Sequence, residues 1–75
     1  METARPLDAL NQARNKRVVV ELKNKTTLIG DLKAFDIHIN TVLDNAEEWE
    51  NGAMKRKIGK AFLRGDTIIM ISPQQ

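Results

Sequence analysis

The sequence contains no cysteine, so the chain can form neither a disulfide framework nor a thiolate metal site. It has a single histidine, His38, which also excludes the histidine clusters that hold zinc. Isolated carboxylates could still bind a hard cation loosely. We therefore expect no structural metal and no cofactor.

Long apolar runs are missing as well. No stretch approaches the roughly 20 apolar residues of a membrane span. The first residues include Glu2 and Arg5 but not the apolar core of a signal peptide. We expect an intracellular, cytoplasmic protein with no membrane partner.

The chain has little net charge and little length. A formal net charge of +2 would give only weak, salt-sensitive attraction to a polyanion, so RNA binding would need a specific pocket. The 75 residues make one domain, because a chain this short buries only roughly 60% of its unfolded surface. Without disulfides or metal, stability at this size usually comes from a partner subunit.

Residue spacing predicts one short helix followed by five strands. Pro6 suits the first turn of a helix, and the apolar residues that follow predict a helix over 6–13. From Arg17 the apolar period changes to two, which is typical of half-buried strands. The predicted strands cover residues 17–23, 26–35, 41–50, 54–63 and 67–72, and the turns between them include Asn24-Lys25, Asn51-Gly52 and Arg64-Gly65-Asp66.

Two features of these strands favour a bent sheet that assembles. Gly30 lies inside a strand, where glycine usually marks a bulge, a sharp bend or a close backbone approach. The segment from Ile68 to Ile71 is apolar at every position, so both of its faces must be covered. A neighbouring subunit is the natural cover, and head-to-tail contacts between different edges close into rings.

Two polar turns, residues 36–40 and 64–66, stand out against the apolar strands. In a five-stranded barrel they can lie side by side. His38 and Arg64 each offer a flat face for stacking on a base, and Asn40 offers an amide that can pair with a base edge. Together they outline a nucleobase pocket.

Alternation within the first turn predicts which side chains reach this pocket. His38 and Asn40 are two residues apart and should point to the same side, with Ile37 and Ile39 facing the core. Asp36 would share the polar side, but aspartate more often closes a turn by accepting backbone N–H groups. We interpret Asp36 as structural.

The orientation of the Asn40 amide would decide which base is read. Uracil presents O4 as an acceptor and N3–H as a donor, whereas cytosine reverses both groups. An acceptor-only carboxylate could hold the amide NH2 in place, and Asp66 is the candidate for this role.

These residues resemble two known sequence motifs. The segment Leu22 to Leu43, with Gly30-Asp31-Leu32, Phe35-Asp36 and Asn40, resembles the first Sm motif. The segment Leu63-Arg64-Gly65-Asp66 resembles the second Sm motif. The chain is similar to Sm-like (Lsm) proteins, most closely to the archaeal ones, and the resemblance covers nearly all of residues 1–75 as a single domain.

The resemblance implies a mostly β fold: a small, strongly bent, SH3-like barrel of five antiparallel strands with a short N-terminal helix. The motifs would occupy about 18–43 and 58–72. It also implies a homo-oligomeric ring, usually a heptamer, that binds single-stranded uridine-rich RNA around its pore. The residues matching the family's RNA-binding positions are His38, Asn40, Arg64 and Asp66. The resemblance implies that the uracil stacks between His38 and Arg64 and that Asn40 reads its edge.

The sequence differs from related proteins in two places. It lacks the Tyr-Lys-His type of second motif found in the bacterial Hfq branch, so a six-membered ring of that type is disfavoured. Relatives often have glycines where this chain has Asn24-Lys25, which lies outside both motifs.

Other functions are compatible with parts of the sequence. The ring could be an interaction scaffold without base-specific binding, or Asp36 and His38 could act as acid and base in a ribonuclease. The run Lys55-Arg56-Lys57 is usually a solvated strand face, although it could attract RNA backbone. Trp49 lies among glutamates, which repel phosphate, so a packing or loop role is favoured over stacking on a base. We predict an RNA-binding protein in RNA processing or metabolism that is not an enzyme.

Overall fold

The computed structural model describes residues 6–74 and consists of a helix followed by five strands in one antiparallel sheet. The elements are α1 (Pro6–Asn11), β1 (Arg17–Leu22), β2 (Thr27–Phe35), β3 (Thr41–Glu50), β4 (Ala53–Leu63), a 3-10 turn (Gly65–Thr67) and β5 (Ile68–Pro73). The bounds of all five strands lie within one residue of those predicted, so the fold prediction is confirmed.

The helix is shorter than the predicted span of 6–13. After Asn11 the chain continues with tighter bonds to the third residue back, such as Ala13 N–H to Leu10 O at 2.9 Å. Asn15 then has a φ of 67°, a left-handed conformation that turns the chain toward β1. No helix within residues 6–74 has the length and apolar character needed to cross a membrane.

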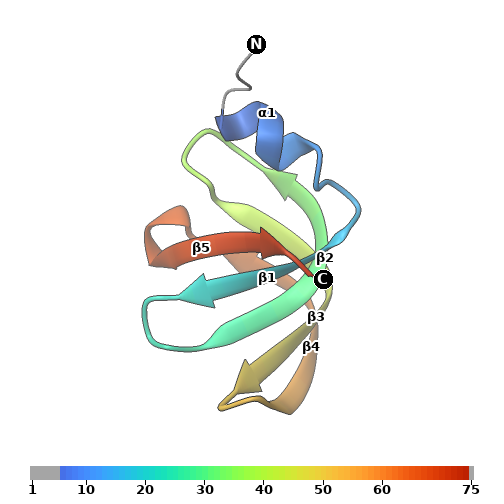
Figure 1. Ribbon diagram of the computed structural model, residues 1–75, viewed down its shortest axis with the longest axis vertical. Coiled ribbons are helices and arrows are strands. Elements are labelled where there is room, and N and C mark those ends of the chain that lie inside the picture. The colour runs from blue at the N-terminus through green and yellow to red at the C-terminus, as the bar shows by residue number, and fades with distance from the viewer. Residues whose placement is uncertain (1–5, 75) are drawn as a thin grey trace.

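The strands lie in the order β4-β3-β2-β1-β5, so β4 and β5 are the two edges of the sheet. Figure 1 shows the sheet bending strongly, with α1 at the end opposite the tip of the β3–β4 hairpin. Register shifts interrupt both the β2–β3 and the β3–β4 pairing. Such bulges increase local twist and allow a small sheet to curl around its own core.

Gly30 lies at one of these shifts, between the pairs formed by Ile29 and Asp31. A β-carbon at residue 30 would stand 3.0 Å from Asp44 O and 3.2 Å from Leu43 Cβ. The missing side chain therefore allows β3 to approach β2 closely, as the sequence predicted.

The core lies on one face of the sheet. The buried apolar residues come mainly from the three central strands, with one from β4: Val18, Val20, Leu28, Leu32, Leu43, Ala46 and Ala61. Leu10 and Ala13, at the helical end of the chain, pack against this cluster. By contrast, four of the five exposed large hydrophobic residues lie on the edge strands: Met54, Phe62, Ile69 and Met70.

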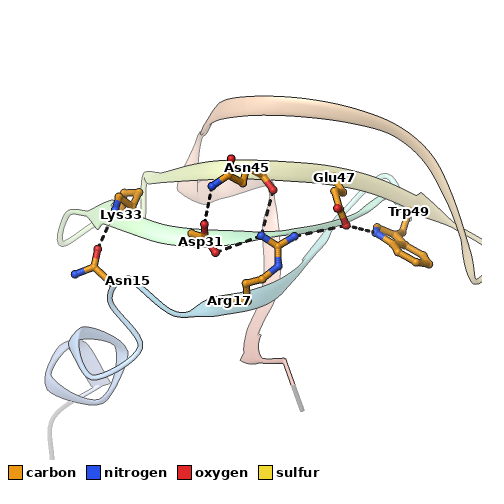
Figure 2. Close-up of polar contacts among 7 residues, drawn as sticks. All are labelled: Asn15, Arg17, Asp31, Lys33, Asn45, Glu47 and Trp49. Atoms are coloured by element: carbon orange, nitrogen blue, oxygen red, sulfur yellow. Dashed lines mark hydrogen bonds and ion pairs between the residues drawn. The ribbon is translucent and has the colours of Figure 1, made fainter.

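A chain of polar contacts crosses the opposite face of the sheet (Figure 2). The Arg17 guanidinium lies 3.2 Å from Asp31 Oδ1 and 3.5 Å from Glu47 Oε1. Asn45 Nδ2 donates to Asp31 Oδ2 at 2.9 Å, and Trp49 Nε1 donates to Glu47 Oε1 at 3.1 Å. Trp49 is half-buried in this network, in agreement with the packing role predicted for it.

Substitution of Gly30 tests the close approach of β2 and β3. Gly30→Ala should lower the free energy of unfolding by about 1–3 kcal/mol, because the added methyl group forces the two strands apart. Urea unfolding at a fixed protein concentration measures the change. Lys33→Ala, at an exposed position on the same strand, is the control. Equal stability of the two variants would contradict the packing described above.

Candidate functional site

The two polar turns lie side by side, as predicted, because strand register brings them together. Thr41 begins β3 and pairs with Leu63, the last residue of β4. Asn40 immediately precedes Thr41, and Arg64 immediately follows Leu63. The Gly65 N–H donates a hydrogen bond of 2.8 Å to Asn40 Oδ1 across the gap. The four predicted site residues, together with Gly65, line an open depression of about 410 Å³: His38, Asn40, Arg64 and Asp66.

Glycine is required at residue 65 for space. A β-carbon there would collide with the carbonyl oxygen of His38 and approach the carbonyl carbon of Ile39 to 3.0 Å. Its φ is not in the left-handed region, where Gly52 and Gly59 lie. The close contact between the loops explains why the second motif needs glycine at this position.

Asp36, rather than Asp66, holds the Asn40 side chain. Asp36 Oδ2 accepts a hydrogen bond from Asn40 Nδ2 at 3.0 Å. Its other oxygen accepts the backbone N–H groups of His38 at 2.8 Å and of Asn40 at 3.1 Å. Asp66 instead lies 3.4 Å from Nη2 of Arg64. The prediction that Asp66 fixes the amide was therefore wrong, because the turn bends the nearer carboxylate, Asp36, back onto Asn40.

The clamp on Asn40 determines the orientation of its amide. A carboxylate can only accept a hydrogen bond and a backbone N–H can only donate one, so the NH2 must face Asp36 and the oxygen must face Gly65. One amide hydrogen and one lone pair of the amide oxygen remain for a ligand. This arrangement presents a donor beside an acceptor.

The predicted alternation of side chains within residues 36–40 was wrong for Ile37, which is 73% exposed. The segment is a turn rather than a strand: Ile39 has a φ of 64°, and its N–H bonds to Asp36 O at 3.0 Å. Ile39 is half-buried. Thr41, which the sequence analysis did not identify, is 2% exposed and donates from Oγ1 to Ile39 O, fixing the end of the loop.

The two side chains that could stack on a base are open to solvent. His38 is exposed, and within residues 6–74 no hydrogen bond or ion pair holds its ring. The Arg64 side chain is 82% exposed, and among the described residues its one polar side-chain contact is with Asp66 at 3.4 Å. Residues 6–74 contain no group of three or more acidic or histidine side chains that could hold a metal ion.

The predicted basic run on β4 is largely neutralised by β3. Lys55 Nζ lies 2.8 Å from Glu50 Oε1, and Arg56 Nε lies 2.6 Å from Glu48 Oε1. Lys57 has no such partner among the described residues. The hairpin therefore presents paired charges, which favours the solvated-face interpretation over a direct RNA contact.

The same clamp changes the acidity of Asp36. Hydrogen bonding by the Asn40 amide, followed by the backbone N–H groups of His38 and Asn40, lowers the pKa of this carboxyl below its ordinary value of 3.8. The hydrogen bonds within the loop thus favour the ionised form of the Asp36 carboxyl.

This lowered pKa predicts a pH-dependent contribution to stability. A carboxylate whose pKa is lower in the folded state than in the unfolded state stabilises the fold when the pH is above the unfolded-state pKa. This stabilisation is lost as the pH falls through the folded-state pKa, where the carboxylate becomes protonated in both states. Asp36→Asn should therefore be less stable than the wild type in urea at pH 7, and the difference should shrink as the pH falls below 3.8. Asp66→Asn, which removes an exposed carboxylate from the partner loop, should change stability little at either pH. A pH-independent difference for Asp36→Asn would contradict the clamp.

Comparisons with known proteins agree with this geometry. The family model described as the LSM domain matches residues 8–73. A protein of Methanococcoides burtonii, named as a snRNP Sm-like protein, is 48% identical over 69 residues, which cover 92% of this chain and 96% of that one. The Sm protein of Pyrococcus abyssi, solved in complex with a uridine heptamer, superimposes with a TM-score of 0.90 at 39% identity, covering 95% of this chain and 100% of that one. The SmAP1 heptamer of P. aerophilum has a subunit with a TM-score of 0.90 at 32% identity, covering 99% of both chains. The chain belongs to the LSM domain family of Sm-like proteins.

Proposed function

We propose that this protein forms a heptameric ring that binds single-stranded, uridine-rich RNA through His38, Asn40, Arg64 and Asp66, and acts in RNA processing. The observation that carries the proposal is the fixed orientation of the Asn40 amide, with its NH2 on Asp36 and its oxygen on the Gly65 N–H.

The free hydrogen-bonding groups of Asn40 match uracil. Its remaining N–H can donate to O4 of the base, and the second lone pair of its oxygen can accept N3–H. Cytosine would place a donor opposite the N–H and an acceptor opposite the oxygen. Flipping the amide to suit cytosine would break both hydrogen bonds of the clamp, so the protein itself opposes the wrong base.

Stacking supplies the part of the affinity that does not depend on base identity. The His38 ring and the Arg64 guanidinium are exposed at the same depression, where each presents a flat face to a base. Asp66 lies within 3.4 Å of Arg64 and limits the positions that the guanidinium can take. These side chains would hold the base while Asn40 reads its edge.

The two free edges of the sheet support assembly into a ring. β4 and β5 each lack a partner strand on one side and carry exposed side chains, Phe62 at 74% and Ile69 at 64%. Pairing β4 of one subunit with β5 of the next would cover both edges, and the contact is head to tail, as a closed ring requires. The P. aerophilum relative, which superimposes on this chain, is a heptamer.

Binding without cleavage is the activity that the site chemistry favours. A ribonuclease would need Asp36 or His38 to exchange protons, but both oxygens of the Asp36 carboxyl accept hydrogen bonds within the loop. Its lowered pKa makes this carboxylate a poor base near neutral pH. We infer that the protein is not an enzyme and that it acts in the cytoplasm.

Asn40→Ala should weaken oligouridine binding by about 1–3 kcal/mol for each base read and should remove most of the preference over oligocytidine. Titration of labelled oligouridine at near-physiological salt, with oligocytidine as competitor, measures both quantities. An unchanged preference for uridine in Asn40→Ala would overturn the base-reading role. Equal binding of both oligonucleotides by the wild type would favour the scaffold alternative.

Arg64→Ala should reduce the affinity for oligouridine by about 1–3 kcal/mol per stacked base. Arg56→Ala is a closely matched control, because its side chain is 71% exposed compared with 82% for Arg64 and both variants lose one positive charge. Filter binding at two salt concentrations separates the lost stacking from the lost charge. Equal losses in the two variants would show that Arg64 acts only through bulk charge.

A further inference from the structure

An apolar depression of about 310 Å³ lies next to the candidate site, where the end of β2, the start of β3 and the end of β4 meet. Phe35, Val42 and Phe62 supply much of its lining, which also includes Asp36 and Asn40. Asn40 lines the candidate RNA site as well. Phe62 is 74% exposed, the most exposed large hydrophobic residue on the edge strands. Aromatic side chains are enriched at protein–protein interfaces, and an unpaired strand edge is a place where another chain can pair.

The opposite edge of the sheet carries a side chain that suits this depression. Met70 is 46% exposed on β5 and lies on the outer face of the sheet, because its neighbour Ile71 pairs with the fully buried Val20. Phe62 also lies on the outer face, because its neighbour Ala61 is buried in the core. If β4 and β5 of adjacent subunits pair, the sheet continues across the interface and side chains on its outer face stand next to one another.

We propose that Met70 of one subunit seats in this depression of the next subunit, against Phe62, and shields the Asp36–Asn40 hydrogen bonds from water. The inference rests on the ring described under the proposed function. Methionine adapts to irregular gaps, and its sulfur makes favourable contacts with aromatic rings. Hydrogen bonds are stronger where water is excluded. Ring closure would therefore strengthen the clamp that selects uracil.

Cross-linking tests the contact directly, because the chain has no cysteine of its own. In the variant Phe62→Cys with Met70→Cys, diamide should oxidise thiol pairs to intersubunit disulfides and be reduced to its hydrazine. Non-reducing gels should then show a ladder of covalent oligomers. The control variant combines Met54→Cys with Met70→Cys. Met54 is 44% exposed on the same strand but lies eight positions, about 26 Å, from residue 62, so it should give little ladder.

The outcomes separate this inference from the proposed function. A ladder confined to the 62–70 pair supports the contact. The absence of that ladder, in rings that light scattering shows to be intact, overturns it while leaving the ring itself in place. A wild-type protein that light scattering finds monomeric overturns the proposed ring.

A second measurement tests the link to base selection. In intact rings, Met70→Ala should lower the preference for oligouridine over oligocytidine by about three- to tenfold, as expected for partial loss of a shielded hydrogen bond. Met54→Ala should leave the preference unchanged, and Met70→Leu, which keeps the apolar volume, should retain it. The same preference in the Met70→Ala and Met54→Ala rings would overturn the link.

Discussion

The hydrogen bond between the Gly65 N–H and Asn40 Oδ1 joins two loops that are 25 residues apart in the sequence, and the candidate site depends on it. Asp36 holds the NH2 of the amide and the Gly65 N–H holds its oxygen, so a flipped amide would lose both hydrogen bonds. The contact also requires the backbone of His38 to rest directly against the α-carbon of Gly65. One short contact thus positions the loop that carries His38 and Asn40 against the start of the loop that carries Arg64.

Strand register brings these loops together. The Thr41–Leu63 pair places the ends of β3 and β4 opposite each other, and two residues further along Leu43 pairs with Ala61 inside the core. A slip of one residue would turn Leu43 out of the core, so burial strongly opposes it. Core packing therefore supports the geometry of the site even though no residue of the core cluster lines the depression.

Most of the fold could be predicted from the sequence because its signals are local. Period-two spacing, the Asn51-Gly52 turn and the glycine at residue 30 each correspond to the expected strand, hairpin or bulge. The site was predicted less completely. The residues that line the depression were identified, but Ile37 was placed in the core because strand alternation was extended into a turn. The clamp was assigned to Asp66, since only the folded loop shows that Asp36 bends back onto Asn40.

The distribution of charge also bears on how such a ring would recognise RNA. The cations of β4 are the largest basic feature of the sequence, yet Lys55, Arg56 and Lys60 each pair with a carboxylate on β3. This pairing leaves the strand with little charge to offer a phosphate backbone, and the whole chain has a net charge of only +2. The electrostatic attraction between the protein and the RNA phosphates, which does not depend on the RNA sequence, is correspondingly weak. In the proposed ring, affinity would then come from stacking and base-edge contacts repeated in every subunit. Repetition of a weak, selective contact multiplies its selectivity as well as its strength.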